Sequence, residues 1–157
     1  TRIPKDGFVL SARRGSEAAK FLSNLKVGDQ GELTLSFLPE KWNEVVEGIG
    51  GNSRLVKNGK IWEESYRGPK STVDDPRTAL GYNDKKLFLM VVDGRQPGYS
   101  NGMSYNDVAS AMLELGATEA INLDGGSSST FILNGELINR PSGGQERDVL
   151  NAVLITQ

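Results

Sequence analysis

The sequence contains neither histidine nor cysteine among its 157 residues. Without cysteine the chain has no thiolate nucleophile, no disulfide and no thiolate metal ligand. Without histidine it lacks the commonest general base and metal ligand, so a Ser-His-Asp triad and a histidine-ligated zinc site are excluded within this chain. Any catalysis must therefore use carboxylates, guanidinium or amino groups, tyrosine or hydroxyl groups.

An excess of charge of one sign is also missing. Eighteen Lys and Arg residues stand against 20 Asp and Glu residues, which gives a formal net charge of −2. General nucleic-acid binding needs a basic face, and this balance argues against it. No apolar run approaches the length of a membrane span. The length is that of one ordinary domain, so we expect residues 1–157 to form a single domain.

The most informative stretch covers residues 119–131. It opens as an apolar strand over 119–123 and continues into Asp124, the pair Gly125-Gly126 and four hydroxyl residues at 127–130. Glycine lets the backbone approach a ligand closely, and successive free N–H groups form an anion-binding nest. The stretch therefore predicts a binding or catalytic site, with an ordinary polar loop as the alternative interpretation.

The first half of the chain shows mostly local patterns. Ser16 caps a helix that we expect to continue to about Leu25. Asn58-Gly59 lies between two apolar pairs and predicts a β-hairpin. Residues 63–76 are polar and predict a long loop. Alternating or apolar residues predict further strands at 7–12, 32–37 and 42–49.

The second half alternates strands with a helix. Residues 86–92 are a continuous apolar run, which is typical of a central strand covered on both faces. A capping-box pattern at Ser104 predicts a helix over 105–115. Asn134-Gly135 predicts a second hairpin within residues 130–139. Further strands are expected at 77–82, 119–123 and 149–156.

The strand–helix–strand succession between residues 86 and 123 has a geometric consequence. A crossover through a helix normally joins parallel strands, whose carboxyl ends lie at the same edge of the sheet. Asp93 and Asp124 each follow such a strand, and we expect them to face one crevice, where ligand sites of open α/β sheets lie. The predicted fold is α/β with α+β character: a mixed β-sheet with few helices that contains one βαβ unit.

Four segments together resemble the phosphodiester glycosidase family. They are residues 76–81, residues 92–95, residues 122–130, and the pair Glu146-Arg147 with Val149, Asn151 and Ala152. Each segment alone is modest, but their order and spacing are specific, and the match covers most of the chain. Two positions depart from the family pattern: Ser127 stands where a third glycine is frequent, and Asp148 stands where proline is frequent.

Family domains usually begin with further strands, which this sequence does not show. The chain opens at Thr1 without an initiator methionine. We therefore expect a processed or excised piece that is incomplete as a catalytic unit, with a further segment or chain completing the domain.

The resemblance implies hydrolysis of a sugar-1-phosphodiester, with release of a free sugar and a phosphomonoester. Guanidinium forks and backbone N–H groups suit the phosphodiester anion, and a carboxylate suits reaction at the anomeric carbon. We expect Asp124 to act as nucleophile or base, with Asp93 orienting it or binding sugar hydroxyls and Glu146 sharing the carboxylate role. Arg77 and Arg147 are expected to hold the phosphate. The expected substrate-binding residues are Arg77, Thr78, Arg95, Asn122, Gly125, Gly126, Ser127, Ser128, Ser129, Thr130, Arg140 and Arg147.

Partners and alternatives follow from the same resemblance. The expected partner is a phosphorylated sugar or glycan of a cell wall, cell surface or exopolysaccharide, with an extracellular or cell-surface localisation and a bacterial-type source. No cofactor is expected, and no ligand motif supports a metal at Asp93 and Asp124. Two alternatives remain, a non-catalytic module that binds phosphorylated glycans and an N-terminal nucleophile hydrolase that uses Thr1. An enzyme turns substrate over, whereas a binding module shows saturable affinity alone.

Overall fold

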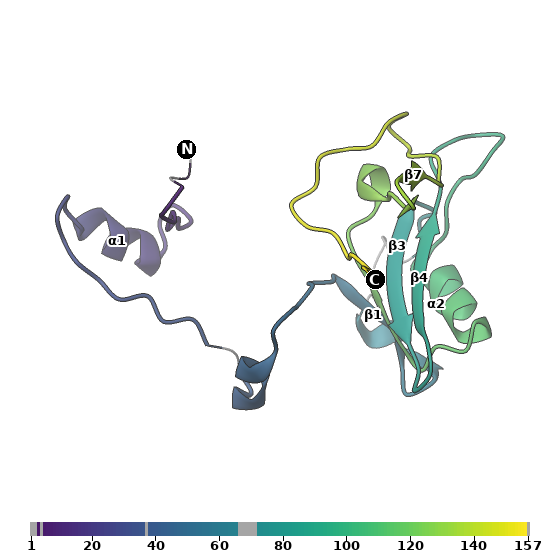
Figure 1. Ribbon diagram of the computed structural model, residues 1–157, viewed down its shortest axis with the longest axis horizontal. Helices are drawn as coiled ribbons and strands as arrows, with labels where there is room; N and C mark the ends of the chain where they lie inside the picture. The colour runs from purple at the N-terminus through teal and green to yellow at the C-terminus, as the bar shows by residue number, and fades with distance from the viewer. Residues whose placement is uncertain (1–2, 4, 37, 66–71, 157) are drawn as a thin grey trace. The chain divides into compact units, whose positions relative to one another are not determined.

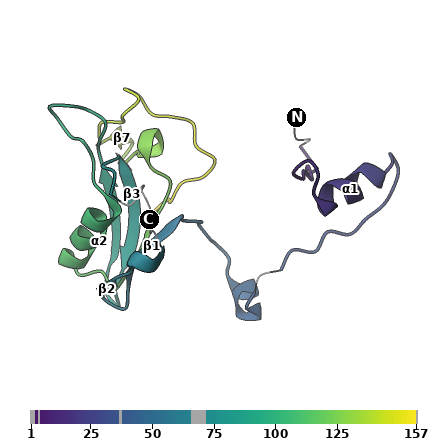
Figure 2. The ribbon, with the colours of Figure 1, turned by 180° about the vertical axis from the view of Figure 1, so that it is seen from behind.

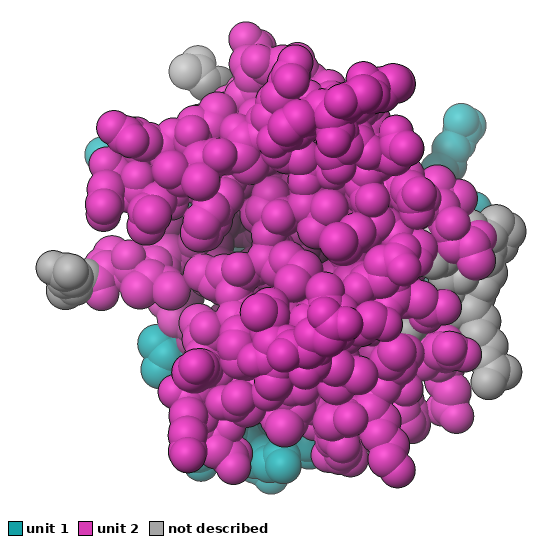
Figure 3. Space-filling model, turned by 90° about the vertical axis from the view of Figure 1, so that its right-hand side faces the viewer, with its two compact units in different colours: residues 1–46 teal, residues 47–157 magenta. Residues whose placement is uncertain are grey.

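The computed structural model describes residues 3, 5–36, 38–65 and 72–156 (Figure 1). The chain divides into two compact units, residues 1–46 and residues 47–157, which Figure 3 colours separately. Each unit is considered by itself. The expectation of one domain over the whole chain stays a prediction.

The first unit contains the predicted helix, α1 (Glu17–Asn24). Its N-cap is Ser16, whose hydroxyl accepts a hydrogen bond from the Ala19 N–H at 3.1 Å, and Glu17 lies in the first turn. The cap satisfies one of the N–H groups that a helix start leaves without a partner. This part of the chain also forms the short 3-10 helix η1 (Glu40–Glu44) after Pro39.

The second unit is built on a five-stranded sheet with the order β2-β1-β5-β3-β4. Each adjacent pair is antiparallel. Because β4 and β5 are both antiparallel to β3, they run in the same direction, and α2 joins them. The α+β character predicted from the sequence is thus confirmed. The strands are β1 (Ser53–Lys57), β2 (Lys60–Ile61), β3 (Arg77–Tyr82), β4 (Leu87–Val92) and β5 (Glu119–Asn122).

Helix α2 (Tyr105–Glu114) packs against this sheet and closes the hydrophobic core (Figures 1 and 2). Its capping box is formed as predicted, since the Ser104 hydroxyl accepts from the Asp107 N–H while the Asp107 carboxylate accepts from the Ser104 N–H. The hydrogen bonds from the Ser104 side chain and backbone lower the pKa of Asp107. The buried core residues are Leu55, Val56, Ala79, Tyr105, Val108, Ala109, Met112, Ala117 and Ala120.

Both Asn-Gly turns predicted from the sequence are confirmed. Asn58 and Gly59 have φ of 51° and 69° between β1 and β2, and Asn134 and Gly135 have φ of 53° and 82° between β6 and β7. Two consecutive residues with positive φ match the twist of the flanking strands, which is why this dipeptide is favoured. The remaining elements are η2 (Glu63–Ser65), η4 (Gly126–Ser128) and the two-stranded sheet of β6 (Ile132–Leu133) and β7 (Glu136–Leu137).

Several strand predictions are wrong. The described residues of 7–12, 32–37 and 149–156 form no strand, and 42–49 gives way to η1 and irregular backbone. Apolar alternation makes a segment suitable for a sheet, but a strand also needs a neighbour for its backbone N–H and C=O groups. Part of the predicted loop at 63–76, residues 66–71, lies outside the described residues.

Strand β4 also differs from its prediction. It lies at the end of the strand order rather than in the centre, and Leu87 and Leu89 are 51% and 37% exposed. Its apolar run therefore reflects one face packed towards the core and a second face that is only partly covered.

Among the described residues, no helix combines the length and the apolar character needed to cross a bilayer.

Replacing Ser104 with alanine tests the capping box. Ser104→Ala removes the acceptor for the Asp107 N–H and should lower the free energy of unfolding by about 1 kcal/mol, measured by urea denaturation. Ser110→Ala on the exposed face of the same helix is the matched control and should leave stability unchanged or slightly higher. Equal effects of the two substitutions would contradict the capping role.

Candidate functional site

The site end of the sheet is the end at which β4 and β5 finish and β3 begins. Pro76, which is fully buried, immediately precedes β3. A Cβ at Gly94 would lie 2.7 Å from the Pro76 nitrogen, and a Cβ at Gly125 would lie 2.7 Å from the Pro76 carbonyl oxygen. That oxygen also accepts the Gly126 N–H at 2.9 Å. Only glycine fits at these two positions, so both Asp-Gly pairs lie against one proline backbone.

The Asp93 carboxylate is occupied by hydrogen bonds. One oxygen accepts from the Asn139 amide at 2.9 Å, and the other accepts from the Tyr99 hydroxyl at 3.1 Å and the Arg140 N–H at 2.9 Å. Its own backbone carbonyl accepts from the Ser100 hydroxyl at 2.6 Å. A carboxylate that accepts several hydrogen bonds is a good structural anchor. Asp93 therefore joins the loop after β4 to the segment after β7.

The Asp124 carboxylate is in a different state. It is exposed, and one of its oxygens accepts the N–H of Gly125 at 2.9 Å. No other hydrogen bond reaches it from the described part of the chain. Of the two aspartates, Asp124 is the one whose lone pairs remain available for a substrate or a water molecule.

The glycine turn does not form the predicted nest of free N–H groups. The N–H groups of Gly125, Gly126, Ser128 and Ser129 all donate within the chain, to Asp124, Pro76, Gly125 and Gly126 respectively. Gly126 has φ of 63°, which a residue with a side chain rarely adopts, and it starts η4. The turn is thus stabilised mainly by its own backbone, and its side-chain hydroxyls and the Ser127 N–H, which has no acceptor among the described residues, are left to bind an anion.

Two of those hydroxyls meet an arginine. Nη1 of Arg147 lies 3.3 Å from the hydroxyl oxygens of both Ser127 and Ser128. Ser127 and Arg147 line an open hollow of about 520 Å³ together with Gly143, Gln145, Glu146 and Asp148. A guanidinium beside two neutral hydroxyls in an open hollow suits a phosphate group. Glu146 lies with this group rather than among the contacts of Asp93.

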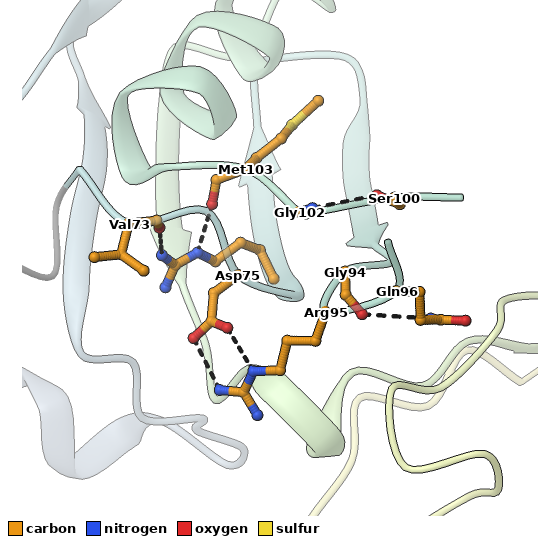
Figure 4. A network of polar contacts seen from close by, with 9 residues as sticks. Val73, Asp75, Gly94, Arg95, Gln96, Ser100, Gly102 and Met103 are labelled. Atoms are coloured by element: carbon orange, nitrogen blue, oxygen red, sulfur yellow. Dashed lines mark hydrogen bonds and ion pairs between the residues drawn. The ribbon is translucent and has the colours of Figure 1, made fainter. Parts of the chain in front are cut away.

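A second arginine lies against the same turn. Arg95 forms a bidentate ion pair with Asp75, with Nε–Oδ1 and Nη2–Oδ2 distances of 2.6 and 3.0 Å (Figure 4). A Cβ at Gly126 would lie 3.1 Å from both Nη1 and Nη2 of Arg95. The hydrogen bond with Asp75, opposed by partial burial, raises the pKa of Arg95, which is therefore charged at every pH of interest.

Other predicted site residues are buried within the framework. Arg77 is 6% exposed, donates to the carbonyls of Met103 at 2.9 Å and Val73 at 2.6 Å, and lies over the ring of Tyr105. This placement favours a structural role for Arg77 over direct contact with a phosphate. The Thr78 hydroxyl donates to that of Ser129, which is 1% exposed.

Asn122 and Thr130 are also enclosed. Asn122 is 1% exposed and donates to Asn52, whose amide donates to the Tyr105 hydroxyl. The hydroxyl of Thr130 is buried and has no hydrogen-bond partner among the described residues. Neither polar group is accessible to a substrate.

The structure adds three polar residues that the sequence analysis did not single out. Asp75 pairs with Arg95, Asn139 joins Asp93 to the carbonyl of Ser129, and Tyr99 donates to Asp93. The only available signal was for Asp75, which directly precedes the motif that begins at position 76. The guanidinium of Arg140 lies 5.1 Å from the centre of the Tyr99 ring.

A metal centre and an N-terminal nucleophile at Thr1 are the other chemistries that the sequence raised. Among the described residues, no three acidic side chains gather as a metal-binding group. Thr1 lies outside the described residues. The available chemistry at the site end thus includes the accessible carboxylate of Asp124, two guanidinium groups and serine hydroxyls, with the carboxylates of Glu146 and Asp148 in the hollow beside Arg147.

Comparisons with known proteins agree with this chemistry. The model of the family described as phosphodiester glycosidase matches residues 2–156. The N-acetylglucosamine-1-phosphodiester alpha-N-acetylglucosaminidases of Homo sapiens and Bos taurus are 32% and 31% identical over 87% of this chain, which spans 30% and 29% of their lengths. The zebrafish catalytic domain of this name, auto-inhibited by its pro-peptide, superposes with a TM-score of 0.53 at 32% identity, over 60% of this chain and 34% of that one.

The anchoring role of Asp93 can be tested by a nearly isosteric change. Asp93→Asn places an amide NH2 where the carboxylate accepted bonds, so one donor then faces another donor. The free energy of unfolding should fall by about 1.5–3 kcal/mol, as for hydrogen bonds to charged groups, measured by urea denaturation. Asp84→Asn, in the exposed turn between β3 and β4, is the control. Equal free energies of unfolding for the two variants would contradict the anchoring role of Asp93.

Proposed function

Since the chain belongs to the phosphodiester glycosidase family, we propose that it hydrolyses a sugar-1-phosphodiester to a free sugar and a phosphomonoester. N-Acetylglucosamine-1-phosphodiesters are the first substrates to test, because the names of its relatives specify this group. We further propose that the substrate is a cell-surface or extracellular glycan and that the protein acts there.

Phosphate binding falls to the exposed donors at the turn. The hydroxyl oxygens of Ser127 and Ser128 each already lie 3.3 Å from Nη1 of Arg147. A phosphate oxygen that enters between them accepts charge-assisted hydrogen bonds, which are stronger than neutral ones. The open hollow at Ser127 leaves room for the group that the phosphate carries.

The chemical step falls to Asp124. The bond between the anomeric carbon and the phosphate oxygen breaks, and its electron pair leaves with the phosphomonoester. Asp124 either takes a proton from the water that attacks this carbon or attacks the carbon itself, after which water releases the sugar. The departing phosphate is already a competent leaving group, so a strong general acid is not required.

The other polar residues support this step. Asp93 holds the segment after β7 against the loop after β4, which places Arg140 at the rim of the site. Glu146 is proposed to share the carboxylate role at the far side of the phosphate, beside Arg147.

One observation carries the proposal. An exposed carboxylate with free lone pairs, Asp124, is separated by only two glycines from the serines that contact Arg147. A group that reacts with carbon and a group that binds phosphate are thus held on one short, internally bonded turn. A module that only binds phosphate has no use for the carboxylate.

Asp124→Asn keeps the size of the side chain and removes the charge that attacks carbon or takes a proton. Turnover of a capped N-acetylglucosamine-1-phosphodiester should fall about 100- to 10,000-fold. Calorimetric affinity for the same compound should hold or increase, because a neighbouring negative charge is gone. Asp84→Asn serves as the control. Binding without turnover in the wild-type protein would instead identify a glycan-binding module.

Arg147→Ala should chiefly weaken binding. It removes a charge-assisted contact worth about 1.5–3 kcal/mol, which corresponds to a rise in Kd of about tenfold or more. Calorimetry with the capped phosphodiester measures the change, and Lys85→Ala, at the opposite end of the sheet, controls for the loss of one positive charge. An unchanged Kd would remove Arg147 from the phosphate site.

A further inference from the structure

The ion pair between Asp75 and Arg95, called here the Asp75–Arg95 clamp, is held from the Asp75 side. The Asp75 N–H donates to the carbonyl of Met103 at 3.3 Å, and its carbonyl accepts the Met103 N–H at 3.1 Å. A Cβ at Gly102 would lie 2.4 Å from the Asp75 carbonyl. The backbone of Asp75 is therefore fixed on a packed segment, which sets the point from which its carboxylate reaches Arg95.

Arg95 is constrained as well. Its φ is 57°, an uncommon value for a residue with a side chain, and its N–H donates to the carbonyl of Asn101 at 3.3 Å. Asp75 holds the edge of the guanidinium formed by Nε and Nη2, and the remaining nitrogen points away from Asp75 (Figure 4). Nη1 makes no hydrogen bond with the described residues.

The clamp is poorly suited to stabilising the fold. The side chains of Arg95 and Asp75 are 53% and 27% exposed, and ion pairs at such positions contribute little to stability. A bidentate pair is nevertheless specific in direction, because the planar guanidinium fits a carboxylate in one orientation. What the clamp fixes is the position of the Nη1 group beside Gly126.

This position has a chemical meaning at the proposed site. The phosphate of a sugar-1-phosphodiester carries one negative charge before the reaction and gains a second as the bond to the anomeric carbon breaks. A fixed cation beside the phosphate stabilises that gained charge more than the bound substrate, and so acts on the rate rather than on binding. Arg147 instead contacts the hydroxyls of Ser127 and Ser128, and no carboxylate of the described residues pairs with it, so we assign it to substrate binding.

We propose that Arg95 stabilises the charge gained by the departing phosphate, and that Asp75 is the positioning residue that aims it. The proposal rests on the proposed phosphodiester hydrolysis. It assigns Arg147 to substrate binding and Arg95 to the chemical step. The close approach of the guanidinium adds to the positive φ of 63° in favouring glycine at position 126, since a Cβ there would lie only 3.1 Å from Nη1 and Nη2 of Arg95.

The test separates kcat from KM on the capped phosphodiester. Arg95→Gln should lower kcat about 100-fold, and Asp75→Asn should lower it about tenfold, as for removal of a partner that orients a reacting group. KM should change little in both. Asp74→Asn, the exposed neighbour of Asp75, is the matched control and should behave as wild type. A raised KM with unchanged kcat in Arg95→Gln would overturn the assignment.

Chemical rescue tests the aiming itself. Millimolar guanidinium chloride should restore part of the kcat of Arg95→Ala, because Asp75 holds the added cation in place. It should not restore the double variant with Asp75→Ala. Equal rescue of Arg95→Ala and of the double variant would show that Asp75 does not position the cation.

A last measurement separates this proposal from the proposed function. If the wild-type protein turns over no sugar-1-phosphodiester, the proposed function fails, and the clamp is judged by nuclear magnetic resonance with inorganic phosphate. A shift of the Arg95 Nε–H signal with phosphate in the wild type, lost in Asp75→Asn and kept in Asp74→Asn, supports the clamp. A signal that phosphate does not move in the wild type overturns it.

Discussion

The arrangement of the site end depends on the backbone of Pro76. Gly94 and Gly125 approach it so closely that no Cβ fits at either position. Two loops that are about thirty residues apart in sequence are thereby packed against one proline. This packing fixes the backbone positions of the side chains next to those glycines. Proline has a fixed φ and no N–H, so the contact is rigid, and the Pro76 carbonyl adds one hydrogen bond from the Gly126 N–H.

Around this contact the polar groups divide by burial. Arg77, Asn122 and Ser129 are almost fully enclosed and exchange hydrogen bonds with the framework. Asp124 and Arg147 remain accessible. Most buried polar groups are satisfied within the protein, with Oδ1 of Asn122 and the Thr130 hydroxyl as exceptions among the described residues. Enclosure therefore favours a supporting role, whereas a group that binds a changing charge on the substrate needs free lone pairs or donors.

The sequence predicted those features that depend on neighbours along the chain. The caps at Ser16 and Ser104 and the two Asn-Gly turns are local devices, and all four are present. Features that depend on distant segments were predicted less well. Residues 149–156 alternate like a strand and form none, and the partners of Asp93 could not be read because Asn139 has no distinguishing local pattern. The common direction of β4 and β5 was predictable from the helix between them, whereas the burial of Arg77 was not.

Strand β4 has a consequence for the protein in concentrated solution. Among the described residues no strand pairs with the outer side of β4, and a row of unpaired N–H and C=O groups can template pairing with another molecule. The run from Leu87 to Val92 is apolar and β-branched at its end, which favours aggregation of this kind. Lys85 and Lys86 precede it and Asp93 follows it. These charges act as gatekeepers, and because salt screens them, the colloidal behaviour of the protein should be governed by ionic strength.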